Sequence, residues 1–478
     1  MDDLRDRAKH AAALLEALAE NPRLLAELSE DERHRLVIAA GKVSRPERES
    51  HRVMRKALRK KSKEQVRRSD ESILDATGIR AARRAPVFVA PPQLPPPLAP
   101  ESAETPPEEE LREARKCYVC KADFTRVHAF YDQMCGACAD LNYRKRHQTF
   151  DLRGRYALVT GARVKIGYHA ALKLLRAGCH VIVTTRFAND AAARYAREDD
   201  FEEFRDRLQV FAVDLRHTPS VEAFCQHLLG TLPRLDFILN NACQTVRRPP
   251  GFYRHLMEGE LGQPDSRLLL VLGGDRALTP TAMVRGEVAT LATSHEDLHL
   301  FPEGELDADL QQVDLRGRNS WRLTLSEVSA VELLEVQLVN AVAPFILNAR
   351  LKPLMVNVPT RDKHIVNVSA MEGQFYRAWK TDKHPHTNMA KAALNMMTRT
   401  SAKDYLKDGI HMNSVDTGWI TDEDPLEIAA RKVEEHGFEP PLDIVDGAAR
   451  ICDPIFDGFL TGEHRWGLFL KDYAPARW

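Results

Sequence analysis

Short, continuously apolar runs recur between residues 156 and 369 and constrain the fold more than any other feature of the chain. The runs are YALVT (156–160), HVIVTT (180–185), LQVFAVD (208–214), DFILNN (236–241) and HIVNVS (364–369). Strands buried on both faces of a parallel sheet have this continuous hydrophobicity. Helical segments separate the runs. We therefore expect an α/β fold with a doubly wound, Rossmann-type parallel sheet.

The chain has 478 residues, which is more than one hydrophobic core usually organises, since single cores stop growing near about 250–300 residues. Changes in composition predict four parts. They are a small helical region (1–40), a basic segment with a proline-rich linker (41–110), a four-cysteine module (111–147) and a Rossmann-type domain (148–478) with an insertion at about 246–325.

The charged residues are balanced overall but unevenly placed. There are 68 Lys and Arg against 69 Asp and Glu, which argues against a chain that binds nucleic acid by its net charge alone. Within residues 42–68 cations dominate, and this stretch is either a solvated helix or arm, or a contact for a nucleic-acid backbone. The charged N-terminus lacks the apolar core of a signal peptide, and no apolar run reaches about 18 residues. These features predict a cytoplasmic protein with no membrane contact.

Four cysteines form two Cys-x-x-Cys pairs with fourteen residues between them, Cys117 with Cys120 and Cys135 with Cys138. Each pair supplies two thiolates from one tight turn, and together they complete a tetrahedral Zn²⁺ site. Four protein ligands leave no open position for water, so the metal is expected to be structural, in a zinc-ribbon-like module. The other cysteines are scattered and are expected to be buried thiols.

A glycine-containing turn follows the first apolar run and leads directly into a helical segment. It contains Thr160, Gly161, Lys165, Ile166 and Gly167. Glycines at a strand-to-helix turn permit a tight bend and close approach of the backbone, and the helix N-terminus offers free N–H groups to a pyrophosphate. The two glycines alone are a weak signal, but their position after a buried strand strengthens the prediction of a dinucleotide site.

From about residue 151 onward the chain resembles the short-chain dehydrogenase/reductase family. The resemblance rests on the glycine turn, on Asp214 after the third run, on Asn240-Asn241-Ala242 after the fourth, and on the motifs VNAVAPF, IVNVSA, NMAKAAL and Asp416-Thr-Gly-Trp-Ile-Thr421. It implies an NAD(P)-dependent oxidoreductase that acts on a small-molecule substrate. It also implies a homo-oligomer formed through the helices that contain Asn340 and Lys391.

The resemblance implies a role for each matching residue. Asn340, Ser369 and Lys391 match the catalytic positions, and Lys391 would also hold the nicotinamide ribose. The glycine turn would bind the pyrophosphate, Asp214 would lie near the adenine, Asn241 and Ala242 along the ribose, and Thr421 at the nicotinamide carboxamide. Arg186, after the second run, favours NADP over NAD because a cation there meets the 2′-phosphate of the adenosine.

Two residues depart from the family pattern. Lys165 stands where the family has its middle glycine, although its ammonium could contact phosphate directly. Thr387 stands where the family has its catalytic Tyr, and an aliphatic hydroxyl is far less acidic than a phenol. Either another group supplies the proton, with His384, His386 and Tyr376 as candidates, or the chain is an inactive nucleotide-binding scaffold in a larger assembly, in which nucleic acid could take part.

The insertion at about 246–325 is longer than the loop that the family has there. It contains two further strand-like runs, at 267–273 and 282–293. In a doubly wound fold it would leave from the carboxyl ends of the strands, above the cofactor crevice. It is expected to be a lid over the substrate or a docking surface for a protein partner.

Overall fold

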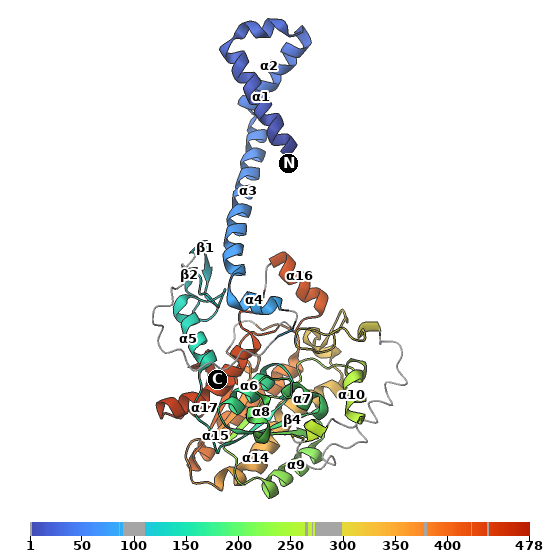
Figure 1. Cartoon of the computed structure of the whole chain (residues 1–478), viewed down its shortest axis with the longest axis vertical. Helices are drawn as coiled ribbons and strands as arrows, with labels where there is room; N and C mark the ends of the chain where they lie inside the picture. The colour runs from blue at the N-terminus through green and yellow to red at the C-terminus, as the bar shows by residue number, and fades with distance from the viewer. Residues whose placement is uncertain are drawn as a thin grey trace. The chain divides into compact units, whose positions relative to one another are not determined.

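The computed structural model describes residues 2–85, 87–88, 110–262, 266–269, 271–272, 299–376, 380–421, 423–436 and 439–478. The chain divides into two compact units, Met1–Ser72 and Ile73–Trp478 (Figure 1). The second unit contains the sheet and the four cysteines. Part of the predicted linker and the predicted run at 282–293 lie outside the described residues.

The first unit is helical, as the sequence predicts for residues 1–40. It contains α1 (Asp2–Glu20), the 3₁₀ helix η1 (Pro22–Glu27), α2 (Glu30–Ser44) and most of α3 (Arg48–Asp75). Asn21 accepts a hydrogen bond from the Arg23 amide at the start of η1, where Pro22 presets the backbone. Leu18 is buried, whereas most other residues of this unit are exposed, so its helices have little core of their own.

The second unit is built on an eight-stranded sheet with the order β10-β9-β8-β7-β6-β3-β4-β5. The strands are β3 (Tyr156–Thr160), β4 (His180–Thr185), β5 (Leu208–Ala212), β6 (Phe237–Asn240), β7 (Lys363–Ser369), β8 (Ile410–Asp416), β9 (Phe469–Lys471) and β10 (Ala474–Ala476). All neighbouring pairs are parallel except β9 with β10. The strand order reverses between β3 and β6, which confirms the predicted doubly wound fold.

Helices cover both faces of this sheet (Figure 1). One core lies between the strands and α6 (Lys165–Arg176), α7 (Ala188–Tyr195) and α17 (Ile444–Thr461). The other lies under α9 (Thr218–Thr231), α14 (Ala343–Val356) and α15 (Pro385–Lys407). Shorter helices are α8 (Phe201–Phe204), η2 (Arg205–Arg207), α13 (Ala330–Gln337), the π-helical segment η8 (Leu338–Val342), η9 (Met371–Gly373) and α16 (Leu426–His436).

One segment of the described chain, Ala330–Val356, is long and apolar enough to cross a membrane by length and composition, with a mean hydropathy of 1.6. It corresponds to α13, η8 and α14. Leu347, Leu351 and Leu354 of this segment belong to the core beneath the sheet. A helix that packs against a sheet in this way passes the same test as a membrane span.

The four-cysteine module packs against the end of the chain. It consists of the antiparallel pair β1 (Glu110–Lys116) and β2 (Asp123–Arg126) and of α5 (Gly136–His147), and α4 (Gly78–Arg84) packs against it through Ile79. Tyr131 and Met134 are fully buried in a core that also contains Ile420 and Ile444 from the sheet domain. The module and the sheet domain therefore share one hydrophobic core.

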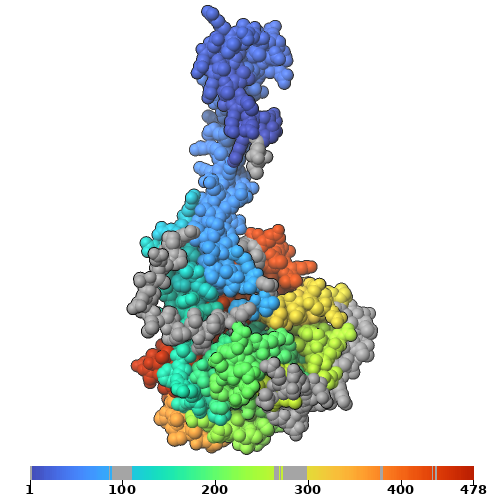
Figure 2. Space-filling model, viewed as in Figure 1, coloured from blue at the N-terminus to red at the C-terminus, as the bar shows by residue number. Residues whose placement is uncertain are grey.

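The described parts of the insertion are mostly irregular. They contain η3 (Pro250–Tyr253), α10 (Arg254–Leu261), α11 (Ser266–Leu269), η6 (Ser320–Arg322) and η7 (Leu325–Glu327). The prediction of a strand-like run at 267–273 is wrong for its first residues, because Leu268 and Leu269 lie in α11 and only Leu272 bridges to Val210 of β5. An apolar run of this length is ambiguous between helix and strand. In Figure 2 the yellow surface after residue 300 adjoins the green surface of the sheet domain.

Candidate functional site

A cavity of about 550 Å³ opens at the carboxyl ends of β3, β4, β5 and β6, where the strand order reverses. Ligands of doubly wound folds bind at this point of the sheet. Most of the predicted cofactor-binding residues line the cavity: Gly161, Lys165, Ile166, Gly167, Arg186, Asp214, Asn241, Ala242 and Thr421. The topology thus brings together residues from four strand ends and from the segment after β8.

The turn between β3 and α6 needs its two glycines. Gly161 has a φ of +65°, and a Cβ there would lie 2.8 Å from the Ala242 Cα. A Cβ at Gly167 would lie 2.3 Å from the Asn241 Nδ2, which itself donates a hydrogen bond to the Thr160 carbonyl oxygen at 3.0 Å. The Thr160 hydroxyl accepts from the Ala242 amide at 3.0 Å. Close approach of two strand ends therefore fixes the shape of the turn.

Lys165 occupies a glycine-like position in the same turn. Its φ of +55° lies in the left-handed region, which a side chain adopts only at a cost in backbone energy. The Lys165 Nζ lies 3.8 Å from a carboxylate oxygen of Asp309, which belongs to the insertion. Burial raises the pKa of Asp309, and the ammonium acts in the opposite direction.

Arg186 directly follows β4 and lines the cavity. Its guanidinium lies 4.3 Å from the centre of the Tyr253 ring. Four other cavity-lining arginines have carboxylate partners: Arg163 pairs with Asp190, Arg216 with Asp214, and Arg248 and Arg316 with Asp314. No ion pair of Arg186 is present among the described residues, so its charge remains available to an anion.

The Asp214 carboxylate is held by the neighbouring Arg216, whose Nη2 lies 2.6 Å away. Burial acts to raise the pKa of Asp214, but the hydrogen bonds and charge of Arg216 outweigh burial and lower it. Asp214 is therefore ionised at neutral pH. It forms part of the cavity wall near Arg186.

The predicted catalytic residues are buried and are not among the residues that line the cavity. Asn340 belongs to the π-helical segment, where its Oδ1 accepts a hydrogen bond from the Gln244 amide at 2.7 Å. The Lys391 Nζ donates to the Val368 carbonyl oxygen at 2.8 Å, next to Ser369 at the end of β7. The exposed fractions of Asn340, Ser369, Thr387 and Lys391 are 1%, 3%, 3% and 4%. The fold brings Ser369 and Lys391 together, but the walls of the cavity do not include them.

The three candidate proton donors have different surroundings. The His386 Nε2 lies 3.5 Å from a carboxylate oxygen of the buried Glu332. His384 caps α15 and stacks on Trp321 of the insertion, with ring centres 3.8 Å apart, and its burial lowers the pKa to about 4. Tyr376 is exposed. The Thr387 hydroxyl has no hydrogen-bond partner within the described part of the chain.

Sequence reasoning missed the contribution of the insertion to this site. Asp307, Asp314 and Arg316 line the cavity, and Trp321 covers the start of α15 through its stack on His384. Only the position of the insertion above the crevice hinted at these contacts. Their residue types carry no signature of a binding site.

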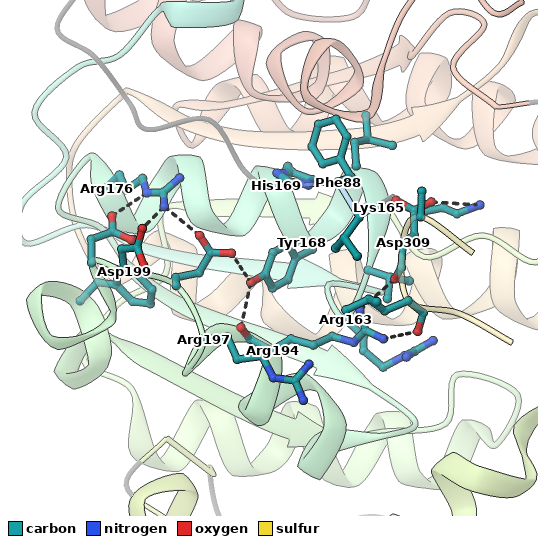
Figure 3. Close-up of a pocket in the computed structure, with 18 of the residues that line it drawn as sticks. Phe88, Arg163, Lys165, Tyr168, His169, Arg176, Arg194, Arg197, Asp199 and Asp309 are labelled. Atoms are coloured by element: carbon teal, nitrogen blue, oxygen red, sulfur yellow. Dashed lines mark hydrogen bonds and ion pairs between the residues drawn. The ribbon is translucent and has the colours of Figure 1, made fainter. Parts of the chain in front are cut away.

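A second cavity of about 820 Å³ lies beside α6 (Figure 3). Its cations are largely paired, since Arg176 contacts Glu198 and Asp200, and Arg194 donates to the carbonyl oxygens of Asp309 and Leu310. In Figure 3 the Lys165 and Asp309 side chains lie near one another beside Phe88. The Phe88 amide donates to the Ala308 carbonyl oxygen at 2.9 Å. The Lys165–Asp309 pair thus joins the insertion to the glycine turn, and the bonds of Arg194 and Phe88 join it to α7 and to residues 87–88.

The four predicted zinc ligands converge. The Sγ atoms of Cys117, Cys120, Cys135 and Cys138 all lie within 4.8 Å of one another, and those of Cys120 and Cys135 are 3.6 Å apart. A tetrahedral zinc–thiolate site with Zn–S bonds of about 2.3 Å places its sulfurs roughly 3.8 Å apart, so the cluster fits the metal. Burial acts to raise the pKa of Cys117, but backbone N–H groups near its sulfur lower it to about 7.

The basic residues of α5 pack against α17. Arg146 donates hydrogen bonds to Asp443 at 2.6 Å and to Asp446 at 3.0 Å, and Lys145 donates to Asp453 at 2.6 Å. Burial acts to raise the pKa of Asp443, but the Arg146 charge outweighs burial and lowers it. The charges of Arg146 and Lys145 are therefore paired with carboxylates of α17, and neither residue forms a surface for binding an external partner.

Comparison with known proteins supports the identity of the fold. The profile of the short chain dehydrogenase family matches residues 155–254, and a profile described as enoyl-(acyl carrier protein) reductase matches residues 317–437. An uncharacterized protein of Acanthamoeba polyphaga mimivirus is 33% identical over 360 residues, which are 72% of this chain and 71% of that protein. Dehydrogenase/reductase SDR family member 13 of Bos taurus is 38% identical over 104 residues, 20% of this chain and 27% of that protein.

Solved structures with similar folds include a putative short chain dehydrogenase of Escherichia coli CFT073 complexed with NADPH. It is 18% identical, with a TM-score of 0.42, over 68% of this chain and 98% of that chain. A putative short-chain dehydrogenase/reductase of Burkholderia multivorans with bound NADP is 18% identical, with a TM-score of 0.41, over 68% of this chain and 99% of that chain.

Proposed function

Because the chain belongs to the short-chain dehydrogenase/reductase family of oxidoreductases, we propose that it binds NADP in the crevice at the end of β3 and transfers hydride between this cofactor and a small-molecule substrate. The single observation that carries the choice of NADP over NAD is Arg186, whose charge lacks an ion-pair partner in the described structure and lies over the Tyr253 ring. A phosphate group suits such a cation better than a ribose hydroxyl does.

The residues of the crevice fit the chemistry of a phosphorylated dinucleotide. The turn around Gly161 and Gly167 lies at the start of α6, whose N-terminus has no side-chain cap and can offer its N–H groups to a pyrophosphate. Asp214 would face the adenosine, Asn241 and Ala242 the riboses, and Thr421 the carboxamide. A bound nicotinamide would supply or accept the hydride, and Lys391, whose Nζ donates to the Val368 carbonyl oxygen, would hold its ribose.

We favour His386 as the proton donor in place of the family's Tyr. The His386 Nε2 lies 3.5 Å from a carboxylate oxygen of Glu332, which orients the imidazole beside Thr387. His384, with its pKa lowered to about 4 by burial, is neutral at physiological pH and is a poorer acid. Replacing His386 with Gln is expected to reduce turnover far more than it weakens cofactor binding, whereas His384→Gln leaves the larger part of turnover intact.

The second candidate function is a catalytically inactive nucleotide-binding scaffold. The observation that favours it is the burial of the catalytic positions, together with Thr387 in place of Tyr. A scaffold would bind NADPH without oxidising it in the presence of carbonyl compounds. The exposed basic part of α3, residues 48–68, would then be its contact with nucleic acid, and deletion of this part would abolish salt-dependent retention on RNA.

The cysteine module is proposed to hold one structural Zn²⁺. Its four sulfurs are close enough to share a tetrahedral ion, and their coordination leaves no site for a substrate. A colorimetric assay on the purified full chain is expected to detect one equivalent of Zn²⁺ per chain. Less than a tenth of an equivalent, after purification without chelators, would contradict this assignment.

We also propose that two copies associate through α14 and α15. Leu334, Phe345, Met389 and Met396 are exposed on α13, α14 and α15, and such neighbouring apolar residues are typical of a contact between subunits. We further propose a cytoplasmic location for the protein. In the proposed site, the described part of the insertion would form the wall between the cofactor and the substrate.

Cofactor binding is tested with NADPH and NADH in parallel fluorescence titrations. NADPH is expected to bind at least ten-fold more tightly. An independent readout uses Cys243, an exposed cysteine in the cavity wall, because bound NADPH should slow its alkylation by a maleimide. Cys243→Ser identifies the labelled thiol. If neither titration nor protection detects a dinucleotide, the proposal is wrong.

A further inference from the structure

The segment Asp416–Thr421, which follows β8 and reaches the cavity wall, is held largely by the cysteine module. The Trp419 amide donates a hydrogen bond to the Tyr118 hydroxyl at 3.0 Å. Tyr118 stands between two of the metal-site cysteines, Cys117 and Cys120. One side of the segment therefore rests directly on the first cysteine pair.

A second connection runs through Arg450, which is fully buried in α17. Its Nη1 donates to the Thr417 carbonyl oxygen at 3.1 Å, and its Nη2 donates to the Asn142 Oδ1 at 3.1 Å. The Asn142 Nδ2 in turn donates to the carbonyl oxygen of Cys138 at 2.8 Å. The second cysteine pair is thus linked to the same segment through two side chains.

Gly418 shows how tightly the two connections enclose the segment. Its φ is +79°, and a Cβ there would lie 2.0 Å from the Arg450 Nη1, 2.6 Å from a methyl carbon of Leu442 and 3.1 Å from the Tyr118 hydroxyl oxygen. The residue after Trp419, Ile420, is buried in the core that the module shares with the sheet domain. A shift of the module would remove the Tyr118 support of this backbone and change the position of Asn142, which holds Arg450.

The segment also continues to the predicted catalytic loop. The Asp416 Oδ1 accepts a hydrogen bond from the Met371 amide at 3.1 Å, two residues after Ser369. The Lys471 Nζ lies 3.4 Å from the Asp416 Oδ2 and also faces the Tyr118 ring. Asp416 therefore connects the segment both to the loop after β7 and to Lys471.

We propose that the metal-loaded cysteine module positions the segment Asp416–Thr421, so that the metal in the module sets how firmly the crevice binds its cofactor. The link to the cofactor rests on the proposed function, whereas the link between module and segment stands on the contacts above. The module is then a positioning element of the binding site and not an appended domain.

The test compares two tyrosine variants of the full chain that both keep the ring and lose one hydroxyl. Tyr118→Phe removes the acceptor of the Trp419 amide. Tyr131→Phe is the matched control, because its hydroxyl donates to Asp446 of α17 at 2.6 Å and does not contact the segment. Hydrogen–deuterium exchange of peptides covering residues 410–421 is measured for both, with zinc content and NADPH affinity determined on the same samples.

In Tyr118→Phe we expect the segment to exchange about five-fold faster, in keeping with the loss of one hydrogen bond, and NADPH to bind several-fold more weakly at unchanged zinc content. Tyr131→Phe should leave both quantities near their wild-type values. Removing zinc with a chelator should accelerate exchange at 416–421 further, while β5, at the opposite side of the sheet order from β8, keeps its protection.

Equal exchange in Tyr118→Phe and wild type would overturn the proposal, as would equal acceleration in both variants. If chelation unfolds the chain, the comparison of Tyr118→Phe with Tyr131→Phe still tests whether the module positions the segment. If the wild-type protein binds no dinucleotide, the proposed function is wrong. The hydrogen–deuterium exchange data then test the link between module and segment by themselves.

Discussion

The Nζ atom of Lys165 lies 3.8 Å from a carboxylate oxygen of Asp309, although the two residues are far apart in the chain. The carboxylate lies beside the turn that, in the proposed function, receives the pyrophosphate of the cofactor. We expect Asp309→Asn to tighten NADPH binding about two- to five-fold, because a competing negative charge is removed from a partly solvated pair. Lys165→Met should weaken it by a similar factor. Fluorescence titration measures both.

A weaker affinity in Asp309→Asn would contradict this prediction and would indicate that the pair serves to hold the turn together. The distinction needs a stability control, since Asp309 also belongs to the segment whose carbonyl groups accept hydrogen bonds from Arg194. Thermal unfolding of the variant should therefore stay within a few degrees of wild type.

Replacing Arg186 with Ala is expected to reduce NADPH affinity about 10- to 100-fold, because a charge-assisted contact with a phosphate is lost. Affinity for NADH should change much less. Arg197→Ala is the control, since this exposed arginine lines only the second cavity. Parallel losses for NADPH and NADH in Arg186→Ala would show that the residue supports the site without reading the 2′-phosphate.

Thr387→Tyr restores the phenol that the family uses as its acid. If the remaining positions are intact, carbonyl reductase activity with a panel of simple aldehydes and ketones should appear or rise at least ten-fold. Thr387→Phe is the control because it adds the same ring without the hydroxyl. Thr387 is 3% exposed, so both variants must first be shown to fold by circular dichroism. Equal activity in both variants would exclude a role for the phenol.

Three histidines near the far end of the sheet predict acid sensitivity. The His364 Nε2 lies 2.9 Å from the His464 Nδ1, and the His411 ring packs within 5.3 Å of His364. Burial lowers the pKa of all three, and the neighbouring rings lower that of His364 further. In the unfolded chain they protonate near pH 6.5, so the unfolded state binds more protons below that value.

The free energy of unfolding should therefore fall as the pH decreases below about 6.5, with His364 alone contributing on the order of 1 kcal/mol per pH unit. Urea unfolding at pH 7.5, 6.5 and 5.5 measures this slope. His364→Gln should make the slope shallower. A slope that is identical in wild type and variant would assign the acid sensitivity to other groups.

The exposed apolar residues of α14 and α15 predict a dimer. Phe345→Asp places a charge at the centre of this surface and should convert the dimer to a monomer in analytical ultracentrifugation. Leu325→Asp, at an exposed leucine of η7 outside α14 and α15, is the control. A wild-type chain that sediments as a monomer would refute the prediction.

Much of the sheet could be predicted because buried parallel strands are recognisable one at a time. The runs at 156–160 and 180–185 coincide with β3 and β4, and the turn residues around Gly161 are predictable from the backbone geometry that they permit. The cysteine pairs are equally local. Each of these signals lies within a few neighbouring residues.

The remaining features depend on contacts between distant residues. Nothing near Lys165 in the sequence indicates that Asp309 would lie beside it, and no pattern marks Tyr118 as a partner of Trp419. The burial of Lys391 is also a property of the packed helices and of the strand below, not of its motif. Local patterns give elements and turns, whereas pairings across hundreds of residues emerge only from the assembled fold.

The packing of α5 on α17 determines when, during synthesis of the chain, this part of the fold can be completed. Arg146 is made early, but its partners Asp443 and Asp446 lie about 300 residues later in the chain. While the ribosome extends the chain, this guanidinium must remain hydrated, since burying it without a carboxylate is costly. The module completes its contacts with the sheet domain only after this last helix has left the exit tunnel. Translation therefore separates the synthesis of the cysteine module from the assembly of its contacts with α17.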